Sequence, residues 1–300
     1  MRAATYRSLV FLCAVALTML PLTGGCGGAS GDSAAGDDRP AVLTDTTFLA
    51  DIVQNVAGER MAVSALLPLG ADPHSFEPTP RDAKRIAEST AVVINVLGLE
   101  PQLDDLLADV TGAGVPVIEA AAGLTGAAED PHVWLDPTLV MSYVENVARR
   151  LAEIDPAGAA DYQANAEAYR GELQELDTWI TEQVAAIPAE RRLLVTNHDS
   201  LDYFAARYGF TIVGSVFPTV SGQGAPSAQQ VAALVKEIEA TKAPAIFLET
   251  GGNVDLAAQI AREAGVEVVT DLCIASVGED APTYVEMMRR NVGIIVEALR

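Results

Sequence analysis

A long apolar stripe at helical spacing occupies the middle of this chain and limits the folds open to it. The stripe recurs every three or four residues and consists of Tyr162, Ala166, Tyr169, Leu173, Leu176, Ile180, Val184 and Ile187. This spacing predicts one helix over 158–187, on the order of 45 Å long at about 1.5 Å per residue. The alternative is a pair of helices broken at Gly171, because glycine weakens a helix. A single helix of this length can join two lobes rigidly.

Short apolar segments typical of strands alternate with segments of helical spacing on both sides of this helix. We expect strands at 61–67, 91–96 and 115–119 before it, and at 192–196, 211–216, 245–249 and 266–269 after it. Helices are expected at 81–88, 99–110, 201–208, 227–241, 253–265 and 283–299. Such alternation favours parallel sheets. The predicted fold class is therefore α/β, with two Rossmann-like lobes at 41–157 and 188–300 bridged by the helix over 158–187.

The N-terminus has the pattern of an export signal. Arg2 and Arg7 precede an apolar run over 9–20 that is too short to span a membrane. The small residues before Cys26 resemble a lipobox, in which the cysteine is acylated after cleavage, although Thr23 stands where such boxes usually carry leucine. The alternative is an ordinary signal peptide cut at the same residues. Either way, the protein leaves the cytoplasm.

We therefore predict a signal peptide over 1–25, and an acylated Cys26 at the start of a flexible tether over 26–40. The tether is rich in Gly, Ala, Ser and Asp, which cannot bury enough surface to order a chain. The expected location is extracytoplasmic, lipid-anchored to the outer face of the cell membrane or periplasmic. Cys273 is the one cysteine of the predicted globular region, so no disulfide is possible there.

Charge narrows the range of partners. The formal net charge is −22, and a strongly negative field repels the phosphates of nucleic acid. The same field mildly concentrates divalent cations near the surface. Solubility accounts for most of this charge, so it is consistent with cation binding and argues against a nucleic-acid partner.

The chain has three histidines, and each lies beside an aspartate in a loop-like setting. Neutral imidazole is a preferred ligand of zinc, and a neighbouring carboxylate can hold the second ring nitrogen. A single histidine is more often a surface or core residue, but a repeated Asp-Pro-His with a restricted backbone favours a site. The three segments are Asp72-Pro73-His74, Asp130-Pro131-His132 and Asn197-His198-Asp199. The pattern predicts a metal site.

Four segments together resemble the zinc- and manganese-binding solute-binding proteins of ABC importers, over nearly the whole chain after the tether. In order, they are GADPHSFEPTP, DPHVWLDP, VTNHDSLDYFAARYGF and APTYVEMMRRNV. The resemblance implies two α/β lobes bridged by a long helix, with the metal in the cleft between the lobes. Carried over by position, it implies that His74, His132 and His198 are the metal ligands.

One position departs from the family pattern. Members commonly offer an aspartate as a fourth ligand before the closing helix, and Ala275 stands there in this chain. Asp271 is about 13 Å away along an extended strand at about 3.3 Å per residue, so it cannot simply replace that ligand. We expect three imidazoles plus water, a set that suits tetrahedral Zn²⁺ better than Mn²⁺. Manganese-selective members tend to carry a carboxylate where this chain has His198.

Several other residues near these motifs are not predicted to be metal ligands. Glu249 ends a predicted strand on the cleft side, and we do not expect it to be a ligand. Glu77 is either an acceptor for His74 or a surface residue. Cys273 is expected to be a buried thiol, and Trp134 to pack the loop after His132.

The predicted function is capture of Zn²⁺, or less favourably Mn²⁺, outside the membrane and delivery to an ABC permease powered by its ATPase. We expect a monomer with no enzymatic activity, whose affinity for metal falls as acid protonates the histidines. One alternative is an extracellular zinc hydrolase, because three histidines and a water also describe catalytic zinc sites. Another is a surface adhesin or interaction protein.

Overall fold

The computed structural model describes residues 39–96, 98–222 and 224–300. The predicted signal peptide, the proposed acylation at Cys26 and nearly all of the predicted tether lie outside these residues. Among the helices in the described ranges, none has both the length and the apolar character needed to cross a bilayer.

The first lobe is built on a parallel sheet in the order β2-β1-β3-β4. Its strands are β1 (Ala41–Thr44), β2 (Ala62–Ala65), β3 (Ala91–Ile94) and β4 (Val117–Glu119). Its helices are α1 (Thr47–Ala57), α2 (Pro80–Ala87), α3 (Pro101–Gly112) and α4 (Pro137–Ile154). Alternate side chains face opposite sides of a strand, so Val42 and Val93 join the core under α1 and α4, whereas Leu43 and Val92 join the core under α2 and α3. Burial on both faces is what a parallel sheet requires.

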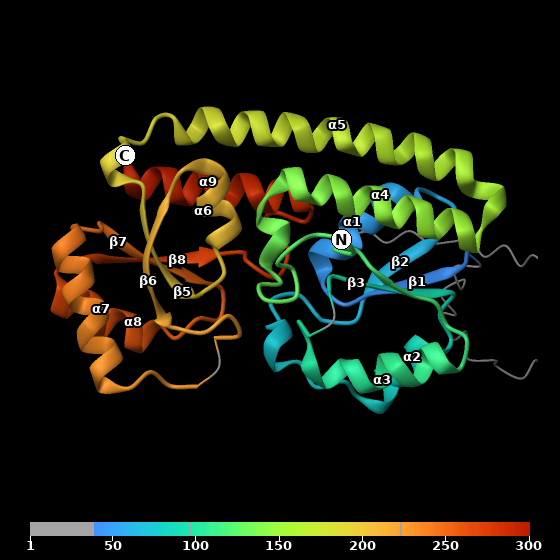
Figure 1. Ribbon diagram of the computed structural model, residues 1–300, viewed down its shortest axis with the longest axis horizontal. Coiled ribbons are helices and arrows are strands. Elements are labelled where there is room, and N and C mark those ends of the chain that lie inside the picture. Colours follow the sequence, from blue (N-terminus) through green and yellow to red (C-terminus); the bar gives the residue numbers. More distant parts are fainter. Residues whose placement is uncertain (1–38, 97, 223) are drawn as a thin grey trace, which may run out of the picture. The chain divides into compact units, whose positions relative to one another are not determined.

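One helix, α5 (Ala159–Val184), leads from the first lobe toward the second. It continues through Gly171, which excludes the alternative of two helices. It ends three residues before the predicted limit, since 185–187 form a turn before Pro188 and a residue before proline disfavours the helical region. Figure 1 shows α5 running along α4 and α9 (Tyr284–Leu299), both of which it contacts. Its buried face consists of Tyr162, Ala166, Tyr169, Leu173, Leu176, Asp177, Ile180 and Val184.

The second lobe repeats the topology of the first, with a parallel sheet in the order β6-β5-β7-β8. Its strands are β5 (Leu193–His198), β6 (Thr211–Phe217), β7 (Ala245–Glu249) and β8 (Glu267–Leu272). Its other helices are α6 (Asp202–Tyr208), α7 (Ala228–Thr241) and α8 (Val254–Ala264). Val195 and Ile246 pack under α7 and α8, whereas Leu194 and Phe247 join the large core that includes α5 and α9. The two predicted α/β lobes are thus confirmed.

In each sheet, the chain order reverses between two central strands. Ligands of open α/β sheets bind outside the carboxyl ends of the strands at such a reversal. In the first lobe these ends lead into Asp45 and Asn95, after β1 and β3. In the second lobe they are His198 and Glu249, the last residues of β5 and β7. Four polar residues therefore lie where open α/β sheets bind their ligands.

Candidate metal site

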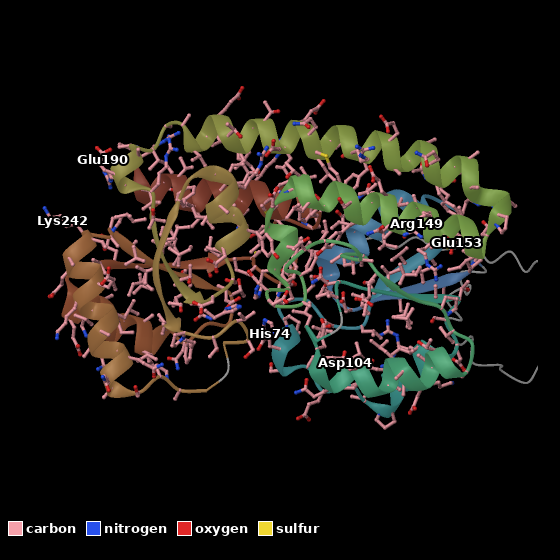
Figure 2. All side chains as sticks on the ribbon, in the orientation of Figure 1. His74, Asp104, Arg149, Glu153, Glu190 and Lys242 are labelled. Atoms are coloured by element: carbon pink, nitrogen blue, oxygen red, sulfur yellow. The ribbon has the colours of Figure 1, made fainter. Side chains whose placement is uncertain are left out.

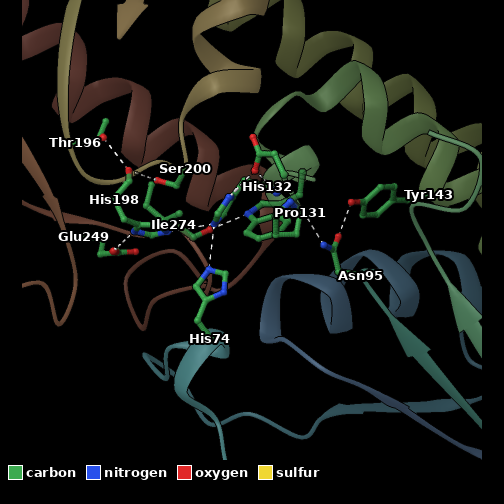
Figure 3. A network of polar contacts seen from close by, with 12 residues as sticks. His74, Asn95, Pro131, His132, Tyr143, Thr196, His198, Ser200, Glu249 and Ile274 are labelled. Carbon is green, nitrogen blue, oxygen red and sulfur yellow. Dashed lines mark hydrogen bonds and ion pairs between the residues drawn. The ribbon is translucent and has the colours of Figure 1, made fainter. Parts of the chain in front are cut away.

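The three histidines come together from three separate elements, as Figure 3 shows. His74 lies in the short 3₁₀ helix η1 (Pro73–Ser75), His132 begins η2 (His132–Leu135), and His198 ends β5. All three side chains are buried. The ring centroids lie 5.1 to 5.6 Å apart. Residues far apart in the sequence therefore form one cluster of imidazoles.

The Nε2 atoms face a common point. Nε2 of His132 lies 3.4 Å from Nε2 of His74 and 3.2 Å from Nε2 of His198. The three potential ligand atoms all lie within 4.8 Å of one another. Zinc–nitrogen bonds of about 2.0–2.1 Å at a tetrahedral angle separate two nitrogens by roughly 3.3 Å. The two shortest spacings therefore match those of ligands around one tetrahedral ion.

The aspartates beside the histidines serve different purposes. Oδ1 of Asp130 accepts hydrogen bonds from the backbone N–H of His132 (3.1 Å) and from its ring Nδ1 (2.7 Å). Oδ1 of Asp72 accepts from the backbone N–H of His74 (3.0 Å), which caps the start of η1. The expectation that a neighbouring carboxylate orients the ring therefore holds for His132. Asp72 instead fixes the backbone at His74 and makes no bond to its ring among the described contacts.

Asn95 positions the loop that carries His132, a role that the sequence analysis missed. Its Nδ2 donates a hydrogen bond of 2.8 Å to the carbonyl oxygen of Pro131. Its Oδ1 accepts from the hydroxyl of Tyr143, and its backbone N–H donates to Oδ2 of Asp45 over 2.6 Å. Asn95 is fully buried, so these bonds satisfy groups that water does not reach. The end of β3 is thereby tied to the histidine cluster.

His198 is held by Glu249. Because Val195 of β5 pairs with Ile246 of β7, the residues three positions further on lie at adjacent strand ends. Nδ1 of His198 donates to Oε1 of Glu249 over 2.8 Å, and Nδ2 of Asn197 donates to the same oxygen. The expectation that Glu249 faces the cleft was correct, but the sequence did not reveal its bond to His198. The nearer aspartate, Asp199, bonds instead to the hydroxyl of Ser215.

These surroundings give the three rings different proton affinities. Burial lowers the pKa of His74 to about 4, with help from the two nearby rings. Burial also lowers the pKa of His132, against the opposing effect of the hydrogen bond that its ring donates to Asp130. Burial of His198 favours a lower pKa as well, but the hydrogen bond and negative charge of Glu249 outweigh it and raise the pKa. Burial likewise favours a higher pKa for Glu249, which His198 and Asn197 overcome, so the pKa of Glu249 is lowered.

The cluster lines a cleft of about 600 Å³ between the lobes. Among the described residues that line the cleft there is no lysine or arginine, and the acidic ones are Asp72, Glu249 and Glu279. Ala275 lines the cleft, whereas Asp271 is exposed and is not among the lining residues. A cation entering this cleft meets imidazoles and acidic side chains from the described part of its wall.

The remaining residues singled out in the sequence take structural positions. Glu77 is exposed. Trp134 is buried, stacks on Phe48 with ring centroids 4.5 Å apart, and donates its indole N–H to the carbonyl of Ile274 over 2.8 Å. Cys273 is a free, buried thiol that lines the cleft but does not belong to the histidine cluster. The expected packing role of Trp134 is confirmed, and its indole links the two halves of the cleft.

Two parallel-sheet lobes with a cluster of imidazoles in the cleft between them define the class of metal-binding solute-binding proteins. The chain belongs to the ZnuA family, described as zinc-uptake complex component A, periplasmic, whose model matches residues 42–298. Membership confirms the resemblance predicted from the four sequence segments. It also agrees with the predicted extracytoplasmic location, as do the lipoprotein names of several relatives.

Relatives with different metals in their names are similar over most of their length. The manganese-binding lipoprotein MntA of Halalkalibacterium halodurans is 34% identical over 292 residues, covering 95% of this chain and 97% of the relative. The zinc-binding protein TroA of Treponema pallidum is 30% identical over 305 residues, covering 96% and 98%. The solved structure of TroA, described as a periplasmic zinc-binding protein, matches with a TM-score of 0.79 at 28% identity, covering 87% of this chain and 99% of that one. A manganese-bound mutant of a periplasmic metal-binding protein from Candidatus Liberibacter asiaticus also matches with a TM-score of 0.79, at 27% identity, covering 87% of this chain and 100% of that one.

Proposed function

We propose that this protein captures Zn²⁺ outside the cytoplasmic membrane and delivers it to the permease of an ABC importer, while a lipid on Cys26 tethers it to the membrane. The observation that carries the proposal is the convergence of Nε2 from His74, His132 and His198 at spacings that suit one ion. Family membership supports the transport role, because relatives are named as substrate-binding lipoproteins of metal ABC transporters.

The choice of zinc rests on the donor set. Three imidazole nitrogens form the cluster, and no carboxylate belongs to it among the described residues. Ala275 offers no ligand at the position where the resemblance implies an aspartate, so water completes the set. An N₃ set with one water suits tetrahedral zinc, and the Irving–Williams order places zinc above manganese. Relatives are named for manganese, iron and zinc, so the choice of zinc is argued from the residues of this chain.

A carrier fits the cleft better than a hydrolase does. A catalytic zinc site needs a carboxylate or imidazole that is able to take a proton from the bound water. Asp130 and Glu249, the carboxylates bonded to the cluster, accept their hydrogen bonds from the Nδ1 atoms of His132 and His198. Both carboxylates therefore orient ligands, which is the arrangement that strengthens metal binding.

The test measures metal content and preference in the full-length protein. Protein purified without added metal is analysed for bound elements, stripped with a chelator, and titrated with Zn²⁺ and Mn²⁺ in competition. We expect one Zn²⁺ per chain and a lower Kd for zinc, with binding lost in a His74→Ala/His132→Ala/His198→Ala variant. A lower Kd for manganese would overturn the choice of ion, and unchanged zinc binding in the triple variant would overturn the site.

A further inference from the structure

The chain crosses back to the first lobe after its last strand. Residues 273–283 join β8 to α9, and we call them the closing segment. In Figure 1 the chain leaves β8 toward the first lobe and then returns along α5 as α9. The closing segment contains Ala275, at the position where the resemblance implies a metal ligand. Because alanine cannot bind an ion, any effect of this segment on the metal has to come from the neighbours of Ala275.

Ser276, the next residue, is bonded to two parts of the first lobe. Its Oγ accepts a hydrogen bond of 2.9 Å from the backbone N–H of Gly70, and lies 3.0 Å from Oγ1 of Thr47 at the start of α1. The hydroxyl of Ser276 donates to the carbonyl of Val277 over 2.8 Å, so Thr47 is the donor in the contact of 3.0 Å. The N–H of Val277 in turn donates to Oγ1 of Thr47 over 3.1 Å. Ser276 is buried, so these bonds satisfy groups that water reaches poorly.

Gly70 lies in the loop that leads into His74. Among the described residues, the backbone of 68–76 forms one hydrogen bond with another segment of the chain, which is the bond from Gly70 to Ser276. The other described backbone bonds of this loop close turns within it. Residues 68–70 are exposed, so packing contributes little to holding this part of the loop. The position of the loop therefore depends on Ser276.

His74 relies on its backbone more than the other two histidines do. The rings of His132 and His198 are held by hydrogen bonds to Asp130 and Glu249. The ring of His74 makes no hydrogen bond to a carboxylate among the described residues. Figure 2 shows His74 where the side chains of the two lobes approach each other. A shift of its loop therefore moves the ring relative to the other two.

We propose that Ser276 is a positioning residue for zinc, which holds the turn at Gly70 and, through it, the backbone that carries His74. This inference rests on the proposed function and adds a residue to the same site. In this chain the closing segment acts on the ion through a hydroxyl that fixes a loop, and not through a ligand at position 275. Because a released loop lets His74 leave the ion, loss of the bond should speed the dissociation of zinc.

The test compares three variants of the full-length protein. Ser276→Ala removes the acceptor of the Gly70 N–H, whereas Ser276→Thr keeps a hydroxyl at the same position. The matched control is Ser89→Ala, which removes a hydroxyl bonded to the carbonyl of Ile86 in the same lobe, outside the cleft. Competition with a zinc chelator measures the Kd, and addition of excess chelator to the zinc-loaded protein measures the dissociation rate. Amide hydrogen exchange of Gly70, followed by NMR, measures its hydrogen bond directly.

We expect Ser276→Ala to raise the Kd for zinc about tenfold, the lower end of the range for a residue that supports a metal ligand. The increase should lie mainly in the dissociation rate, as most affinity changes do. The Gly70 amide should exchange faster in the same variant. Ser276→Thr should keep the amide protected and the dissociation rate near that of the wild type. Ser89→Ala should keep the wild-type Kd although it also loses a buried-side hydrogen bond.

Three outcomes would overturn the proposal. A protected Gly70 amide in Ser276→Ala would show that Ser276 does not hold the turn. A fast-exchanging amide with wild-type zinc dissociation, in either variant of Ser276, would show that the turn does not position His74. An equal rise of the Kd in Ser89→Ala would assign the effect to a general loss of stability. Each of these leaves zinc binding by the wild type, and with it the proposed function, in place, whereas a wild-type protein that binds no zinc would remove both.

Discussion

His198 and Glu249 end neighbouring parallel strands, and the ring Nδ1 of His198 donates a hydrogen bond of 2.8 Å to Oε1 of Glu249. This bond places the proton on Nδ1 of His198, so the lone pair of Nε2 is available to bind a metal. It also turns Nε2 toward Nε2 of His132, 3.2 Å away. The strand pairing of the second lobe therefore sets the orientation of a proposed ligand.

Removal of the Glu249 carboxylate should weaken zinc binding. We expect Glu249→Ala to raise the Kd for Zn²⁺ by about 10- to 100-fold, the range found when a partner of a metal-binding histidine is lost. Glu249→Gln should lose less, because its amide oxygen still accepts from Nδ1. Isothermal titration measures the Kd, and NMR titration of His198 tests the cause, since both variants should lower its pKa. A weakened Kd with an unchanged pKa of His198 would contradict this role, and Glu190→Ala serves as the control.

As the pH falls from 8, the affinity for zinc should depend first on the protonation of His198. Burial lowers the pKa of His74 to about 4 and also lowers the pKa of His132, so these two rings take up protons less readily than His198 does. The raised pKa of His198 means that this ring holds a proton that zinc must displace as the pH falls. Each pH unit below that pKa should therefore raise the Kd about tenfold. The sequence predicted acid sensitivity from all three rings, whereas the structure assigns it first to His198.

Zinc titrations at several pH values between 5 and 8 measure this slope. A slope of one proton per zinc supports the assignment, and the proton released on binding is measured independently by titration in buffers of different ionisation enthalpy. A slope near three protons over the same range would mean that His74 and His132 also carry protons in the metal-free protein.

The sequence carried local signals for the histidines, for most strands and for the long helix. Two of the histidines follow Asp-Pro, which marks a constrained loop, and the stripe over 158–187 marks α5. The stripe overstates the length of α5, because Ile187 remains buried after the helix has ended at Val184. Burial continues through the turn, so the apolar pattern alone cannot locate the end.

The parts that were missed depend on contacts between distant segments. The strand β1 has four residues and is stabilised by pairing with β2 and β3, so it leaves little periodicity to detect. Asn95 and Glu249 show no local pattern, because their functions arise where strands meet in the sheet. A topological reversal of each sheet would have drawn attention to both positions once the strand order was known.

Asn95 should affect both stability and metal binding. Asn95→Ala leaves the carbonyl of Pro131 without its donor and the buried hydroxyl of Tyr143 without its acceptor. An unpaired buried polar group costs about 1–3 kcal/mol, so we expect a loss of at least this size in the free energy of unfolding, measured in urea. The Kd for zinc should also rise, because the loop of His132 loses its anchor.

A second single variant separates these two effects. Tyr143→Phe removes the hydroxyl but keeps the bond from Asn95 to Pro131, so it should lose stability with little change in zinc affinity. If Tyr143→Phe weakens zinc binding as much as Asn95→Ala does, the bond to Pro131 is not what positions His132.

Ala275→Asp should shift the metal preference toward manganese. Ala275 lines the cleft and is partly exposed there, so a carboxylate at this position can reach the space in front of the cluster. Manganese prefers oxygen ligands and higher coordination, so an added carboxylate strengthens manganese binding more than zinc binding. We expect the ratio of the two Kd values to move toward manganese by about tenfold, or about 1.4 kcal/mol, in competition titrations. Ala275→Asn adds an amide of the same size without the charge, and should produce a smaller shift. Equal shifts in the two variants would show that size rather than the carboxylate governs the change, and no shift in either would show that position 275 does not reach the ion.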